Sequence, residues 1–179
     1  SGTNGYDVVY RGEGMSILSG AKKVNGWQEG ENGVWYTRVN DLSFVRDLYI
    51  NNKPAIRARS EKKITGTSNY LAVDSYFNLS DGFYVEKSKM GLYKNPQDII
   101  FHWSVAWKDY QIRVMDIQEA PENNLYYIVK LENPIWNTIA STSVYPHTVP
   151  SYDKGFTIEN AYELLDEPGE FYYDKTMGV

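Results

Sequence analysis

Residues 99–107 read Ile99-Ile100-Phe101-His102-Trp103-Ser104-Val105-Ala106-Trp107. Every second side chain from Ile99 to Trp107 is large and apolar, and the polar His102 and Ser104 fall between them. Because successive side chains of a β-strand point to opposite faces, this alternation predicts a strand with one face in the core. Trp103 and Trp107 lie on that face, and we expect both to be core residues.

The same period of two recurs along much of the chain. Further candidate strands cover residues 34–39, 44–50, 55–59, 70–77, 110–114 and 125–131. Turn-forming pairs such as Asn32-Gly33 and Asn51-Asn52 separate them. The sequence has no βαβ rhythm and no repeat of fixed period. This pattern predicts an all-β fold, namely an antiparallel, jelly-roll-like β-sandwich.

Residues 157–179 depart from this pattern. Thr157 can cap a short C-terminal helix, whose apolar face carries residues 158, 161, 162 and 165, and Pro168-Gly169 ends it. Residues 170–174 are predicted to form a strand, and 175–178 a turn toward a partner strand that the chain does not contain. Two further brief strands are predicted at residues 7–10 and 16–19. We expect both ends to be parts of one larger scaffold.

Composition excludes several classes of function. The 179 residues include no cysteine and two histidines, which leaves little material for a metal site, a thiolate nucleophile or a Ser-His-Asp triad. No cofactor or metal is therefore expected. A net charge of -5 argues against a nucleic-acid partner, and no apolar run has the roughly 20 residues of a membrane span. Carboxylate pairs are numerous, but most fall in predicted turns, so no catalytic pair is predicted.

Aromatic residues make up 15% of the chain, and aromatic rings both favour strands and stack on sugar rings. Trp136 lies near the start of a polar, irregular segment, residues 134–155, that also contains Tyr145 and His147. These three side chains could form a sugar-stacking platform, or they could anchor a loop. The sequence favours neither interpretation over the other.

Arg57 and Arg59 project from the same face of the strand predicted at residues 55–59. Two neighbouring guanidinium groups could bind the carboxylate of an acidic sugar. They could also pair with carboxylates of a neighbouring strand or of the larger scaffold outside this chain, and we favour this structural interpretation.

Several segments together resemble a known family. They are Ile17-Leu18-Ser19-Gly20, Val24-Asn25-Gly26-Trp27, Asn32-Gly33-Val34-Trp35-Tyr36, residues 46–59 ending in Arg57-Ala58-Arg59, and residues 158–172. They resemble the N-terminal part of bacterial glycoside hydrolases with a right-handed parallel β-helix of the pectate-lyase-like kind, xylosidase-type relatives included. In that group a β-sandwich is inserted near the start of the β-helix. Phe171 replaces the more usual Trp, and Asn52 replaces a Gly, which Asn tolerates because it can adopt positive φ.

The resemblance implies a domain organisation. Residues 1–22 would form strands of a β-helix coil, residues 23–156 the inserted sandwich, and residues 157–179 the return to the β-helix. The catalytic acids of the family lie on later coils, so none is carried over to this chain.

The resemblance also implies a function. We expect a non-catalytic accessory domain of a bacterial enzyme that is secreted, cell-surface or periplasmic. It would bind a plant or host glycan, such as a xylo-oligosaccharide, or shape the active-site cleft. The alternative is a structural cap or oligomerisation module for the β-helix, with no ligand. The expected partners are the β-helix of the same parent chain and, in a homo-oligomer, a second copy.

Overall fold

The structure is a computed structural model that describes residues 5, 7–17, 19–60, 82–105, 107–121, 123–141 and 155–179. It divides into two compact units, Ser1–Val39 and Asn40–Val179, and each is described by itself. Within the described ranges, no helix is long and apolar enough to span a membrane.

The first unit contains a short antiparallel hairpin. Strand β1 (Gln28–Glu29) pairs with β2 (Trp35–Tyr36) across the 3-10 turn η1 (Glu31–Gly33). Brief strands were predicted at residues 7–10 and 16–19. The residues of these two ranges that the structure describes form no strand. A strand needs a pairing partner, and this part of the chain has none within the described residues.

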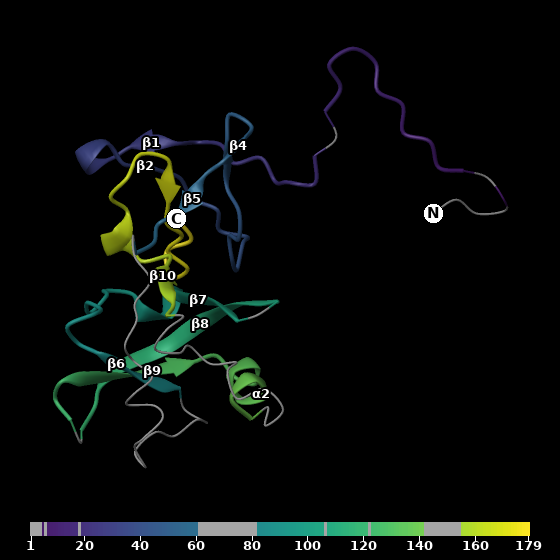
Figure 1. Cartoon of the computed structure of the whole chain (residues 1–179). Helices are drawn as coiled ribbons and strands as arrows, with labels where there is room; N and C mark the ends of the chain where they lie inside the picture. Colours follow the sequence, from purple (N-terminus) through teal and green to yellow (C-terminus); the bar gives the residue numbers. More distant parts are fainter. Residues whose placement is uncertain are drawn as a thin grey trace. The chain divides into compact units, whose positions relative to one another are not determined.

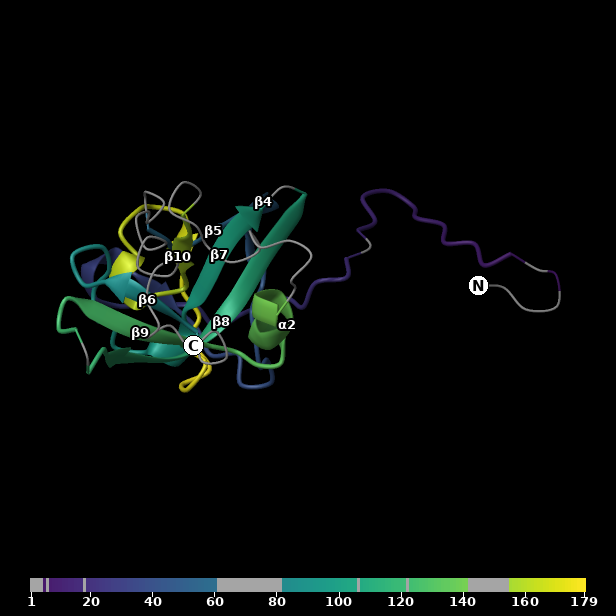
Figure 2. The same ribbon diagram turned by 60° about the horizontal axis from the view of Figure 1, so that its bottom comes forward.

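A five-stranded antiparallel sheet forms the body of the second unit, in the order β10-β7-β8-β9-β6 (Figures 1 and 2). The strands are β6 (Phe83–Glu86), β7 (Ile100–Val105), β8 (Lys108–Glu119), β9 (Tyr126–Leu131) and β10 (Thr157–Glu159). The all-β prediction is confirmed. The alternating motif at residues 99–107 is β7, and the strands predicted at 110–114 and 125–131 lie within β8 and β9. The predicted strand at 70–77 lies outside the described residues.

The apolar alternation fills one side of this sheet. Phe101 and Trp103 of β7 are buried, as predicted, and the Phe101 ring stacks on Phe156 with centroids 4.5 Å apart. The prediction that Trp107 also lies in the core is wrong, because this side chain is 79% exposed. β7 ends at Val105, and the chain reverses there toward β8, so the alternation no longer corresponds to a strand.

The described residues contain one α-helix, α2 (Ile135–Ser141), which lies beside the sheet in both views (Figures 1 and 2). It falls at the start of the segment that was predicted to be irregular. The helix predicted from Thr157 to Leu165 is wrong. Residues 157–159 are β10, Asn160 has a φ of 58°, and a single 3-10 turn η3 (Tyr162–Leu164) follows. Pairing with β7 satisfies the backbone of β10, which overrides its local helical pattern.

Two small sheets complete the second unit. Strands β3 (Tyr49–Ile50) and β4 (Lys53–Pro54) form a hairpin whose turn residues, Asn51 and Asn52, have φ of 51° and 63°. This confirms that Asn can occupy the positive-φ position usual for Gly. Strand β5 (Ile56–Arg57) pairs in parallel with β11 (Glu170–Phe171). β11 begins the strand predicted at 170–174, and one of its sides pairs with β5 of this chain.

Gly82, just before β6, is required by close backbone packing. Its φ is 130°, and a Cβ added there would lie 1.9 Å from the carbonyl oxygen of Val129 on β9. No side chain fits in that space.

A buried polar link also joins the C-terminal residues to the sheet. The Asn160 amide donates to the carbonyl oxygens of Asp98 (2.8 Å) and Tyr173 (3.0 Å), and its oxygen accepts from the Tyr173 backbone NH (2.9 Å).

Candidate functional site

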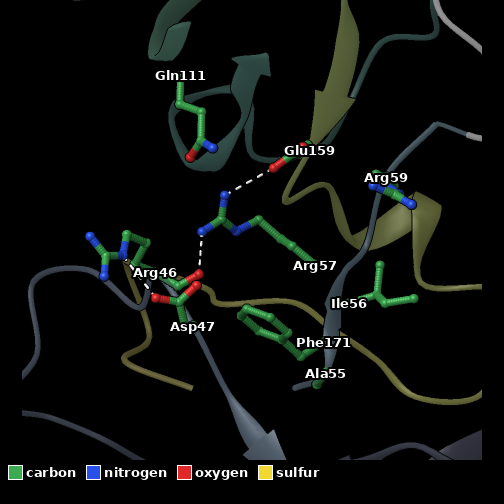
Figure 3. A pocket seen from close by; sticks show the side chains of 9 residues that line it. All are labelled: Arg46, Asp47, Ala55, Ile56, Arg57, Arg59, Gln111, Glu159 and Phe171. Atoms are coloured by element: carbon green, nitrogen blue, oxygen red, sulfur yellow. Dashed lines mark hydrogen bonds and ion pairs between the residues drawn. The ribbon is translucent and has the colours of Figure 1, made fainter. Parts of the chain in front are cut away.

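An open pocket of about 500 Å³ lies in the second unit, where β5, β10 and β11 approach the segment before β3 (Figure 3). Its walls are formed by Arg46, Asp47, Ala55, Ile56, Arg57, Arg59, Gln111, Glu159 and Phe171. Figure 3 shows Arg57 in the middle of this set, with Arg46 and Asp47 on one side and Arg59 on the other. Most of the lining is polar, as expected for a site that recognises a polar ligand.

Arg57 is held in the pocket wall by a buried ion pair. Its Nη1 lies 2.9 Å from Oε2 of Glu159, and each side chain is only 8% exposed. Nη2 donates to the backbone carbonyl of Arg46 at 2.5 Å, and the guanidinium lies over the Phe44 and Phe171 rings at 5.6 and 6.0 Å. Contacts of this kind fix the guanidinium in one orientation. Arg57 is therefore a rigid part of the wall.

The ion pair continues into a chain of polar contacts along β7 and β8. The other oxygen of Glu159, Oε1, lies 2.7 Å from Nδ1 of His102, and Nε2 of His102 lies 2.8 Å from Oδ1 of Asp109. Ser104 donates to the same Asp109 oxygen at 2.7 Å. Only the doubly protonated imidazolium can donate to both carboxylates, so the geometry selects the cationic form of His102.

The electrostatics agree with this geometry. Burial lowers the pKa of His102, but the hydrogen bonds to Glu159 and Asp109 outweigh burial and raise its pKa above the ordinary value. Burial acts to raise the pKa of Asp109, and its hydrogen bonds with Ser104 and His102 reverse this, so that its pKa is lowered. Both shifts favour the charged forms, the imidazolium of His102 and the carboxylate of Asp109.

This chain of contacts is not a nucleophile with its general base. Both ring nitrogens of His102 already face carboxylates, and the Ser104 hydroxyl donates to Asp109 instead of to the imidazole. A catalytic serine needs a base that can accept its proton. The three residue types of a Ser-His-Asp triad are present, but their connectivity is that of a structural network.

The rim of the pocket is more exposed than its wall. Arg46 pairs with its neighbour Asp47 at 2.8 Å, and both side chains are largely in solvent. Arg59 is also exposed, and its guanidinium has no hydrogen-bond or ion-pair partner in the described part of the chain. Its backbone is fixed, because Arg59 forms an antiparallel bridge with Glu159. Gln111, exposed on β8, completes the polar rim.

A second polar cluster lies around Asp98, at the end of the 3-10 turn η2 (Pro96–Asp98). The Tyr172 hydroxyl donates to Asp98 at 2.6 Å, and Asn95 donates to Tyr172 (2.9 Å) and to Asp174 (3.4 Å). Burial and the nearby Asp174 raise the pKa of Asp98, although the Tyr172 hydrogen bond opposes this. The cluster joins the C-terminal segment to η2 and does not line the pocket. No group of three or more acidic or histidine side chains in the described ranges could hold a metal ion.

The structure places the residues selected from sequence in different environments. Arg57 makes the ion pair with a neighbouring strand that the sequence analysis favoured. Arg59 lies on the rim of the same pocket. Trp136 is 0% exposed and packs against Phe83 with ring centroids 5.6 Å apart, so neither of its faces is open to a sugar. Tyr145 and His147 lie outside the described residues.

Two parts of the network were not predicted from the sequence, namely Glu159 and the contact between His102 and Asp109. Glu159 was assigned to a helix and therefore not to the strand beside β7. The His102–Asp109 contact had a detectable signal, because His102 and Ser104 lie on the polar face of a strand whose hairpin partner carries Asp109. The register of that hairpin would have brought them together.

Comparison with known proteins agrees with the all-β class that this fold defines. A solved structure described as "Glycoside hydrolase" matches with a TM-score of 0.62 and 20% sequence identity, over 89% of this chain. The matched region is 27% of that chain, and at this identity the likeness shows the fold alone. No curated protein matches.

The family itself follows from a sequence model. The model of the GH141 insertion domain matches residues 33–178, which is most of the chain, and the chain therefore belongs to the GH141 insertion domain family. An insertion domain of a glycoside hydrolase family fits an accessory domain of such an enzyme. The resemblance found in the sequence is confirmed to this extent.

Proposed function

We propose that this chain is a non-catalytic accessory domain of a bacterial glycoside hydrolase that is secreted, cell-surface or periplasmic. In this proposal the domain binds a plant or host glycan, for which a xylo-oligosaccharide is the first candidate, or shapes the cleft of the parent enzyme. The observation that carries the proposal is the match to the GH141 insertion domain. The polar pocket beside Arg57 supports it, because sugars are recognised by polar side chains set in a concave surface.

The side-chain chemistry supports a non-catalytic role. The polar network beside the pocket uses His102 to bridge two carboxylates, which leaves no free base beside Ser104. The Asp98 cluster has a raised carboxyl pKa, but Asp98 is buried and serves to hold Tyr172 and Lys175. A hydrolase acting on a glycosidic bond needs two carboxyl groups that reach the bond from an open cleft.

The proposed parent scaffold is a right-handed parallel β-helix. The parallel pairing of β5 with β11 supports this part of the proposal. These strands come from distant parts of the chain, yet they lie next to each other in register. Successive coils of a parallel β-helix pair in this way, and a domain inserted between two coils would leave and return at such a pair.

Binding is tested by titrating the whole chain with xylo-oligosaccharides and with a panel of neutral plant and host oligosaccharides. Isothermal calorimetry and chemical-shift changes in NMR spectra are suitable measurements. Saturable binding of at least one oligosaccharide is the expected result. Absence of binding to every member of the panel would overturn the carbohydrate-binding part and leave the cleft-shaping part.

A structural role, as a cap or oligomerisation module, is the second candidate. Exposed apolar side chains on the small sheets favour it, namely Tyr49, Ile50 and Ile56. Phe171 and Tyr173 do not contribute to such a surface, because both are buried within the second unit. Sedimentation of the chain across a concentration series tests this role. A change of apparent mass that Tyr49→Ser abolishes would support it.

A further inference from the structure

We propose that the pocket beside Arg57 binds the carboxylate of an acidic sugar residue, and that Arg59 is the group that contacts this carboxylate. The proposal deepens the carbohydrate-binding function given above and rests on it. It assigns a ligand class to the site, namely oligosaccharides that contain a uronic acid.

The charges of the pocket wall cancel among themselves. The cations Arg57 and His102 are matched by Glu159 and Asp109, and each carboxylate lies within 2.9 Å of a cation. This inner network therefore contributes no net charge to the pocket. Its role is to fix the wall, because the buried Arg57 and Glu159 hold each other in place.

The charges of the rim do not cancel. Arg46 is matched by Asp47. Arg59 is exposed, and no carboxylate pairs with it in the described residues. Among the residues that the structure describes, one positive charge is therefore uncompensated at the edge of the pocket, and this charge would attract an anion.

The shape of the pocket suits a sugar that carries a carboxylate. A guanidinium presents two parallel N–H donors that match the two oxygens of a carboxylate. The rim groups Gln111 and Asp47 can exchange hydrogen bonds with hydroxyls, while Ile56 offers an apolar surface for the C–H face of a ring. The volume of about 500 Å³ lies in the usual range of small-molecule sites.

A polyanion such as nucleic acid fits this site poorly. A single uncompensated cation neutralises one phosphate, and binding to nucleic acid draws on several such contacts. The chain as a whole carries a net charge of -5, which repels a long polyanion. One carboxylate on an otherwise neutral oligosaccharide matches one free guanidinium.

The experiment compares oligosaccharides that differ only in charge. Tri-galacturonate is titrated against its methyl ester, and a xylo-oligosaccharide with one glucuronic acid substituent is titrated against the methyl ester of the same compound. We expect the acidic member of at least one pair to bind about tenfold more tightly, as typical for a charge-assisted hydrogen bond. Raising the salt concentration from 50 to 500 mM should reduce this preference.

Variants assign the preference to Arg59. Arg59→Gln should remove the preference for the acidic oligosaccharide. Arg59→Lys keeps the charge but not the paired donors, and should retain part of this preference. The matched control is Arg11→Gln, which removes an exposed arginine of the first unit and should leave the preference unchanged. The exposure of Arg59 makes a loss of folding in these variants unexpected, and circular dichroism checks this.

The outcomes separate the inference from the proposed function. Equal binding of charged and neutral members, or a preference that survives Arg59→Gln, overturns the acidic-sugar inference while carbohydrate binding stands. Absence of binding to all four oligosaccharides and to the neutral panel overturns both. A preference that Arg59→Gln removes and Arg11→Gln preserves supports the inference.

Discussion

Replacing Glu159 by glutamine should destabilise the second unit more than any exposed charge substitution. Glu159→Gln keeps the size of the side chain but removes the negative charge that faces Arg57 at 2.9 Å and His102 at 2.7 Å. The Arg57 guanidinium then stays buried with its charge uncompensated. Its Nε has no hydrogen-bond partner among the described residues, so little remains there to offset the loss.

The size of this destabilisation follows from the burial of both side chains. Removing one partner of a buried ion pair costs about 3–5 kcal/mol, because the other charge remains out of water. Both side chains are 8% exposed, so solvent screening reduces this little. For a protein of this size each kcal/mol lowers the melting temperature by about 2–4 °C, which gives a decrease of roughly 6–20 °C. The control Glu119→Gln removes the exposed partner of Lys87, and should cost less than about 1 kcal/mol.

The assay is urea unfolding of the whole chain followed by tryptophan fluorescence and circular dichroism. Arg57→Met, Glu159→Leu and their combination complete a double-mutant cycle. Replacing both charges by apolar groups should recover much of the stability lost in either single variant, although His102 still loses a partner. A cost of Glu159→Gln below about 1 kcal/mol, or single-variant costs that simply add in the double variant, would refute the reasoning.

Three further predictions concern stability and use the same unfolding assay. Because the pKa of His102 is raised, its contribution is complete below about pH 6.5 and is lost as pH rises through the raised pKa, so wild-type stability should decline over this range. The difference in unfolding free energy between the wild type and His102→Gln should shrink over the same pH range. A difference that stays constant between pH 6 and 9 would contradict this. Gly82→Ala should cost roughly 3 kcal/mol or more because its Cβ meets a β9 carbonyl, whereas Gly33→Ala, with open space around it, should cost about 1 kcal/mol; equal costs would contradict the close approach. Trp136→Ala should cost about 3–5 kcal/mol and Trp107→Ala less than about 0.5 kcal/mol, and the reverse order would show that Trp136 is not a core residue.

The strands of the main sheet could be predicted from sequence because their signal is local. In β7 the alternation places Phe101 and Trp103 on one face, and burial of that face follows directly. The same rule failed at Trp107, because periodicity cannot show where a strand stops when the next apolar residue keeps the phase. The turn between β7 and β8 begins before it.

The candidate site could not be predicted as a whole, because its parts meet only in the folded chain. The segment from Ile158 to Leu165 has helical periodicity, but β10 at its start is a strand because it pairs with β7. Arg57 and Glu159 are 102 residues apart, and nothing local to either residue identifies the other. What could be predicted was that Arg57 needs a carboxylate, since a guanidinium on a half-buried strand is costly without one.

The separation of Arg57 and Glu159 along the chain also bears on the order of folding. Closing a free loop of 102 residues costs about 4 kcal/mol of chain entropy, and a buried ion pair alone does not offset such a cost. We expect the pair to form after the hairpins of the main sheet have brought β10 into place beside β7. Contacts that form after the rate-limiting step slow unfolding and leave the folding rate unchanged. Loss of the Arg57–Glu159 pair is therefore expected to shorten the lifetime of the folded domain without changing how quickly it folds.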